Sequence, residues 1–123
     1  MSSERSAELA LRLWQAFRSR DWERVTVLVH PDAEIETTLA PGRMVTGVEA
    51  VELWRAAMEE GDWSPRPVVF DELNDETAIV TGLLSAAPAV AGQHDVAAFR
   101  FRDGRLISLR YHATAAEARA NAA

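Results

Sequence analysis

Apolar residues recur at helical spacing in the first part of the chain. In residues 4–19 they lie three, four and seven positions apart, which places them on one face of an amphipathic helix: Ala10, Leu13, Trp14 and Phe17. A second, shorter helix is predicted over residues 22–29, with Asp21 as its N-cap and Pro31 just beyond its end. Because Val25-Thr26-Val27 is a β-branched run, a strand is the alternative for this second segment.

The next segment changes to an alternating pattern. In residues 33–39, Ile35, Thr37 and Leu39 alternate with Glu34 and Glu36, which is the period of a half-buried strand. Pro41-Gly42 then predicts a turn. The sequence Thr46-Gly-Val-Glu49 is a capping box, so a third helix is expected to begin there and to end at Gly61.

Strand patterns replace helical patterns in the second half of the chain. Four strands are predicted, over residues 67–73, 77–87, 93–102 and 105–113. Turn-forming residues separate them, among them Asn74-Asp75 and Asp103-Gly104. Helices followed by hairpin-linked strands indicate an α+β fold rather than a parallel sheet with crossover helices.

The composition is that of one globular domain. The chain has 123 residues, of which 48% are hydrophobic and 26% charged. We expect a single domain over residues 1–123, with an ordered core at about 4–113 and an alanine-rich tail at 114–123. No segment approaches the roughly 18 apolar residues of a membrane span, and the N-terminus lacks a secretory pattern, so a cytoplasmic protein is expected.

The charged and sulfur-containing residues exclude several kinds of chemistry. Cysteine and lysine are both absent, which excludes disulfides, thiolate nucleophiles and Schiff-base lysines. The net charge of −6 argues against a nucleic-acid partner. His30, His94 and His112 lack the spacing of a metal site, so we expect no metal and no other cofactor.

The order helix, helix, strand, helix and four strands resembles the nuclear transport factor 2-like superfamily, specifically its SnoaL-like and ketosteroid isomerase-like members. The resemblance spans roughly residues 8–113 and is carried by these stretches: Arg20-Asp-Trp-Glu, Leu28-Val-His-Pro-Asp-Ala-Glu-Ile, Thr46-Gly-Val-Glu-Ala-Val and Phe99-Arg-Phe-Arg-Asp-Gly-Arg-Leu-Ile. It implies a cone-shaped, cystatin-like roll, in which three N-terminal helices pack on a curved antiparallel sheet and enclose an apolar pocket. It also implies a homodimer formed through the outer face of the sheet.

The resemblance does not extend to the catalytic residues of ketosteroid isomerases. The general base of those enzymes, an aspartate, is matched here by Thr37, and a threonine hydroxyl cannot accept a proton as a carboxylate does. Their protonated oxyanion-hole aspartate is matched by Ala97, and their helix-1 tyrosine by Leu13 or Trp14. A standard ketosteroid isomerase is therefore not expected.

Asp95 and Tyr111 are the candidate catalytic residues. If Phe99 faces the pocket, alternation places Asp95 on the same face, and a hairpin turning at residues 103–105 pairs Ala97 with Tyr111. Asp95 would then lie diagonal to Tyr111, as a general base beside a hydrogen-bond donor. One β-bulge would instead turn Asp95 to solvent and His94 to the pocket, and Tyr111 has core packing as its alternative role.

Seven further residues are expected to contact a ligand in the pocket: Trp14, Phe17, Thr37, Trp54, Met58, Thr81 and Phe99. Ser85 shares the predicted inner face with Thr37 and Thr81, and ordinary core packing is the alternative for the two tryptophans. We expect the pocket to bind a small apolar molecule, polycyclic or aromatic. If the protein is an enzyme, the residues favour cofactor-free acid/base chemistry of the isomerase, cyclase, hydratase or hydrolase type.

Two non-enzymatic functions remain as alternatives. One is a binding or dimerisation module whose pocket is closed by Trp14, Trp54 and Tyr111. The other is a module for a protein partner, which would expose an apolar patch on the sheet beyond what dimerisation covers.

Overall fold

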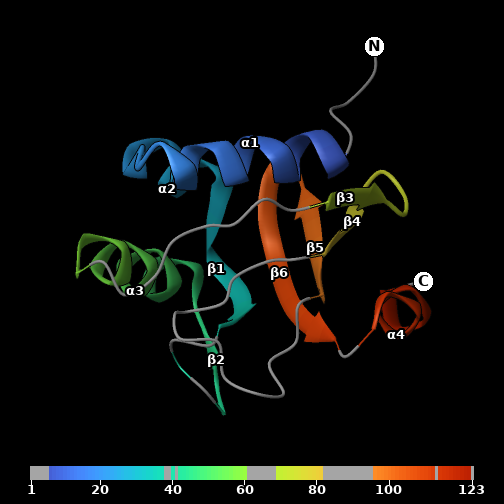
Figure 1. The fold of residues 1–123 in the computed structure, drawn as a ribbon. Coiled ribbons are helices and arrows are strands. Elements are labelled where there is room, and N and C mark those ends of the chain that lie inside the picture. The colour runs from blue at the N-terminus through green and yellow to red at the C-terminus, as the bar shows by residue number, and fades with distance from the viewer. Residues whose placement is uncertain are drawn as a thin grey trace.

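A computed structural model describes residues 6–37, 40, 42–60, 69–81, 96–112 and 114–122. The helices in this part of the chain are α1 (Ser6–Arg18), α2 (Trp22–Leu28), α3 (Gly47–Glu60) and α4 (Ala115–Ala122). The strands are β1 (Val29–Glu36), β2 (Met44–Val45), β3 (Val69–Glu72), β4 (Thr77–Thr81), β5 (Val96–Arg102) and β6 (Arg105–His112). They form one sheet with helices on both sides (Figure 1).

The first two helices form as the sequence predicts. The apolar stripe of α1 is buried, and the Asp21 side chain accepts a hydrogen bond from the backbone N–H of Arg24 at 3.2 Å, which makes it the N-cap of α2. The chain then enters β1 at Val29, four residues earlier than predicted, so Pro31 lies inside a strand. Because proline has no N–H for a ladder, the pairing of β1 with β6 is irregular between Val29 and Glu34.

At the start of α3, one of the two hydrogen bonds of the predicted capping box is present. The Thr46 hydroxyl accepts a hydrogen bond from the backbone N–H of Glu49 at 3.2 Å, whereas the Glu49 carboxylate pairs with Arg43. The buried face of α3 carries Trp54 and Met58 and packs mainly on β1 and α2. None of the described helices is long and apolar enough to span a membrane.

The sheet is mixed rather than purely antiparallel. Its strand order is β2-β1-β6-β5-β4-β3, and β1 lies parallel to β6, while the remaining neighbours are antiparallel. At this one junction the sheet departs from the antiparallel pairing that the resemblance implies. The first strand is inserted beside the last, and the short β2, which the sequence pattern did not predict, forms the edge beyond it.

The β5–β6 hairpin has the predicted register. Phe99 pairs with Leu109, and Ala97 pairs with Tyr111. The turn itself is tighter than expected, because Arg102 pairs with Arg105 across Asp103-Gly104, whose φ angles of 54° and 79° suit a two-residue hairpin turn. A β-bulge on β6, between the pairs Arg100–Ser108 and Phe101–Leu106, then restores the predicted register.

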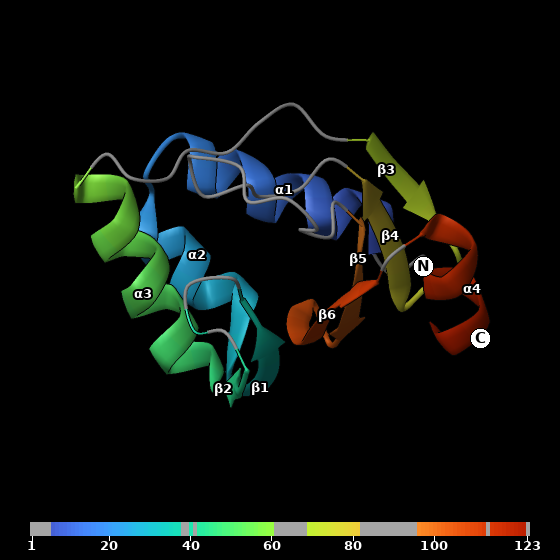
Figure 2. The ribbon, with the colours of Figure 1, turned by 60° about the horizontal axis from the view of Figure 1, so that its bottom comes forward.

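Both faces of the sheet are buried, by different helices. The inner face packs against α1, α2 and α3 in the main core, and α4 covers β4, β5 and β6 from the outer side, where Ala118 is buried with Ile79 and Val96 (Figure 2). Residues 115–122, expected to lie outside the ordered core, therefore form a packed helix. Thr114 caps it by accepting a hydrogen bond from the Glu117 N–H at 3.1 Å.

Candidate functional site

Four of the predicted ligand-contact residues are buried in the main core, Phe17, Trp54, Met58 and Phe99, and Thr37, which follows β1, is buried as well. The rings of Phe17 and Trp54 meet edge to face, with centroids 4.9 Å apart and planes at 88°. Tyr111 packs against the same core from the end of β6. The inner face therefore brings residues from α1, α3, β1, β5 and β6 into one apolar environment.

Two polar atoms in this apolar environment have no hydrogen-bond partner among the described residues. They are the indole Nε1 of Trp54 and the phenolic Oη of Tyr111, both buried. An unsatisfied buried polar group costs about 1–3 kcal/mol, so each atom is a place where a bound acceptor would be stabilising. The indole N–H can only donate, and a protonated phenol can donate as well.

Tyr111 stays protonated at neutral pH. Burial raises the pKa of its phenol well above the usual value of about 10, and the negative charge of Glu36 raises this pKa further. The phenol is therefore a hydrogen-bond donor in this site and not a base. The donor role that the sequence analysis gave to Tyr111 requires a protonated phenol, and the role itself remains a prediction.

Glu36 is a further candidate residue, which the sequence pattern did not reveal. Its carboxylate Oε1 accepts a hydrogen bond from the backbone N–H of Tyr111 at 3.0 Å. Alternation along β1 assigns Glu36 to the outer set, opposite Ile35 and Thr37, and Glu36 is in fact half-buried. Only the three-dimensional pairing of β1 with β6 shows that this carboxylate reaches across to the neighbouring strand.

Trp14 packs against the main core beside β3, whereas Trp54 packs in it against Phe17. Trp14 is half-buried and meets Phe70 of β3 with ring centroids 6.4 Å apart, and the guanidinium of Arg18 lies 5.3 Å from its ring. Since β2 and β3 are the two edges of the sheet and α3 packs on β1 beside β2, Trp14 lies toward the opposite edge of the sheet from α3. Its contact with a ligand remains a prediction.

The predicted inward orientation of Thr81 is wrong. Thr81 pairs with Val96, and directly opposed residues in a sheet point to the same face. Val96 belongs to the small core beneath α4, so Thr81 lies on the outer face. Asp95, Ser85 and His94 lie outside the described residues, and the catalytic role of Asp95 remains untested.

The two described histidines lie in separate environments. The Nδ1 of His30 accepts a hydrogen bond from the backbone N–H of Asp32 at 3.0 Å, and the Nδ1 of His112 lies 3.5 Å from the Glu117 carboxylate on α4. Within the part of the chain that the structure describes, no three histidine or acidic side chains form a group that could hold a metal ion.

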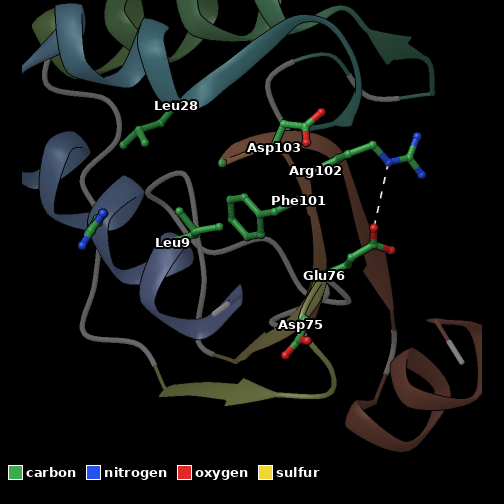
Figure 3. Close-up of a pocket in the computed structure, with 9 residues that line it drawn as sticks. Leu9, Leu28, Asp75, Glu76, Phe101, Arg102 and Asp103 are labelled. Atoms are coloured by element: carbon green, nitrogen blue, oxygen red, sulfur yellow. Dashed lines mark ion pairs between the residues drawn. The ribbon is translucent and has the colours of Figure 1, made fainter. Parts of the chain in front are cut away.

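A cleft of about 520 Å³ lies at the other end of β6 from Tyr111. Leu9, Leu28 and Phe101 converge in it from α1, α2 and β5 (Figure 3). Its rim is charged and mostly exposed, with Arg12, Asp75, Glu76, Arg102 and Asp103. Arg102 lies 4.0 Å from Glu76, and the residues that line the cleft include neither Trp54 nor Tyr111.

The sequence confirms the family that this architecture indicates. The model of the SnoaL-like domain family matches residues 10–109. Because this match covers most of the chain, the protein belongs to the SnoaL-like domain family, a member of the nuclear transport factor 2-like superfamily. No curated protein matches the sequence significantly.

Solved structures share the fold at low sequence identity. Bal32a, from a soil-derived mobile gene cassette, is 24% identical with a TM-score of 0.64, and the alignment covers 86% of each chain. A proposed polyketide cyclase from Sinorhizobium meliloti is 19% identical with a TM-score of 0.57, covering 85% of this chain and 94% of that one. An LEH-like epoxide hydrolase from M. tuberculosis is 15% identical with a TM-score of 0.61, covering 84% and 77%.

These similarities establish the fold alone. The predicted α+β roll is confirmed, and another similar structure is itself described as a cystatin fold. At such identities the activities named for two of these proteins cannot be transferred directly, because one fold supports many functions.

Proposed function

We propose that this domain binds a small apolar molecule, aromatic or polycyclic, against the inner face of its sheet. The observation that carries the proposal is the pair of buried donors, Trp54 Nε1 and Tyr111 Oη, which have no partner among the described residues. An apolar wall with a few polar groups is typical of small-molecule sites. A ligand with one acceptor oxygen would stabilise the complex by occupying either donor.

The same arrangement supports cofactor-free acid/base chemistry as the reaction class. A protonated phenol in an apolar site can stabilise negative charge that develops on a carbonyl or epoxide oxygen. Asp95 is the general base proposed from the sequence. Two structural relatives are named as an epoxide hydrolase and a proposed polyketide cyclase, and both names denote enzymes acting on small organic molecules.

A ligand screen by thermal shift tests the proposal. The panel contains aromatic polyketides, steroids, terpenes and terpene epoxides, and the proteins are the wild type and Tyr111→Phe. A compound at about 100 times its Kd should add roughly 2.7 kcal/mol of stability. Hits that bind the wild type and weaken in Tyr111→Phe support the proposal. Absence of any hit across the panel contradicts it.

A non-catalytic module with a closed interior is the second candidate. Trp54 is only 1% exposed and is packed against Phe17, which in turn contacts Trp22 with ring centroids 6.0 Å apart. This continuous aromatic packing between α1, α2 and α3 is what a filled interior requires. The same screen separates the two candidates, since a closed module gains no stability from any compound.

We also propose that the chain forms a homodimer through the outer face of the sheet. Because α4 covers β4, β5 and β6 in part, the contact would use the face beside it, where Glu34 of β1 and Arg110 of β6 form an exposed ion pair at 3.3 Å. Sedimentation velocity tests this directly, and a monomer at micromolar concentration contradicts it. The cytoplasmic location expected from the sequence remains a prediction.

A further inference from the structure

The end of β1 leaves a gap in the ladder with β6. The pairing of these two strands runs to Ile35 opposite Leu109, and the backbone N–H of Tyr111, two residues further along β6, bonds to a side chain instead. That side chain is Glu36, whose carboxylate accepts the bond at 3.0 Å. A charged acceptor therefore replaces a main-chain carbonyl at this position.

Each residue of this contact also pairs with the strand on its other side. Glu36 pairs with Met44 in β2, and Tyr111 pairs with Ala97 in β5. The carboxylate thus joins the two halves of the sheet at the point where the Tyr111 side chain enters the core. Because the backbone at Tyr111 fixes the point from which its side chain extends, this hydrogen bond constrains where the phenol can lie.

The charge of Glu36 is not neutralised by a nearby cation within the described part of the chain. The neighbouring arginine, Arg110, forms its ion pair with Glu34, and no described arginine or histidine lies within ion-pair distance of Glu36. An uncompensated carboxylate beside a poorly hydrated site repels anions at close range. A neutral acceptor does not experience this repulsion.

We propose that Glu36 is the positioning residue of the ligand site: it holds Tyr111 in place as a donor and makes the site select neutral, oxygen-bearing apolar molecules over anionic ones. The selectivity rests on the function proposed above for the inner face. The positioning role does not, because it concerns the free protein. Two measurements therefore test the two parts separately.

Amide hydrogen exchange at Tyr111 tests positioning without any ligand. Glu36→Ala removes the acceptor and should accelerate exchange of the Tyr111 N–H by about tenfold or more, whereas Glu36→Gln keeps an acceptor oxygen and should restore most of the protection. Glu34→Gln is the matched control on the same strand and should leave Tyr111 unchanged. Unchanged exchange in Glu36→Ala, with the fold intact by circular dichroism, overturns the positioning role.

A pair of probes with one ring system tests selectivity. The probes are 2-acetylnaphthalene, a neutral ketone, and 2-naphthoate, an anion, with binding followed by tryptophan fluorescence. The wild type should prefer the ketone by about tenfold, a difference of about 1.4 kcal/mol, and Glu36→Gln should lose most of this preference through tighter binding of 2-naphthoate.

The outcomes distinguish the two proposals. A preference that is the same in Glu36→Gln and the wild type overturns the selectivity role. If the wild type binds neither naphthalene, the selectivity role fails for this ring system, and the proposed function is judged on the wider ligand panel. The hydrogen-exchange result then stands by itself for or against the positioning role.

Discussion

Tyr111 stands directly opposite Ala97 in the β5–β6 ladder. Position 97 is where the resemblance to ketosteroid isomerases would place a protonated aspartate, and Ala97 is completely buried. The phenol of Tyr111 therefore enters the core next to the position of the missing acid. A tyrosine kept protonated by burial can supply the hydrogen bond that such an acid would donate.

Tyr111 should make the stability of the protein fall at alkaline pH. Below about pH 10 the folded and unfolded chains both carry the phenol proton, so Tyr111 adds no pH dependence. Above that pH the unfolded chain releases the proton, while the folded chain retains it because its pKa is raised. The free energy of unfolding should then decrease by up to about 1.4 kcal/mol per pH unit, as measured by urea denaturation between pH 9 and about pH 11.5.

Tyr111→Phe is the control for this alkaline effect. The sequence contains one tyrosine and neither lysine nor cysteine, so no other side chain titrates near pH 10. The variant should lose the steep decrease and be at least as stable as the wild type at pH 7, because it removes an unsatisfied hydroxyl. Parallel curves for the two proteins would show that the phenol is not held protonated.

Gly47→Ala should destabilise the protein although alanine favours helices. A Cβ at Gly47 would lie 1.9 Å from the backbone oxygen of His30 and 2.9 Å from a side-chain carbon of Val29. The start of α3 would have to move away from β1, which we expect to cost about 2 kcal/mol or more in urea denaturation.

Gly42→Ala provides the comparison for this substitution. A Cβ at Gly42 would meet open space, but the φ of this residue is +84°, so only backbone strain opposes alanine, at a cost of about 1 kcal/mol. Equal losses in the two variants would contradict the close approach of α3 to β1.

Phe17 and Trp54 should be coupled energetically. Their edge-to-face contact joins α1 to α3, and such aromatic pairs contribute about 0.5–1.5 kcal/mol beyond the area they bury. A double-mutant cycle with Phe17→Leu and Trp54→Leu should give a coupling energy in this range. Additive effects of the two substitutions would mean that the rings do not interact in solution.

Removal of residues 114–123 should destabilise the domain and expose its outer face. The truncation uncovers Ile79 and Val96, on which Ala118 is buried. We expect a loss of roughly 2 kcal/mol and increased self-association by sedimentation velocity. Ala118→Asp, which places a charge in the same contact, should act in the same direction. A truncated chain as stable and as monodisperse as the full chain would contradict the packing of α4.

Local patterns allowed much of the fold to be predicted. The apolar stripe of α1, the Asp21 cap and the register of Tyr111 with Ala97 all follow from residues close together in the sequence, through helical spacing, capping chemistry and hairpin geometry. Thr114 and Glu117 have the spacing of a capping box as well, so local chemistry also accounts for the start of α4, although the sequence analysis expects no ordered structure there.

Features that depend on distant parts of the chain could not be predicted in this way. Ala78, Ile79 and Val80 are all completely buried because helices cover both faces of β4. Such a continuous apolar run has no alternating pattern, so it does not predict which face of the sheet Thr81 lies on. The parallel insertion of β1 beside β6 is equally non-local. The hydrogen bond between the Glu36 carboxylate and the Tyr111 N–H depends on that position of β1.

The indole N–H of Trp54 offers the most direct test of the proposed ligand site. In a ¹H–¹⁵N spectrum its resonance can be assigned with Trp54→Phe, and in the free protein its proton should lack the downfield shift of a hydrogen-bonded indole. On addition of a compound that stabilises the protein, the resonance should move downfield, and Tyr111→Phe should weaken binding of that compound. If stabilising compounds leave this resonance unchanged while shifting signals elsewhere, the ligand does not bind at the inner face.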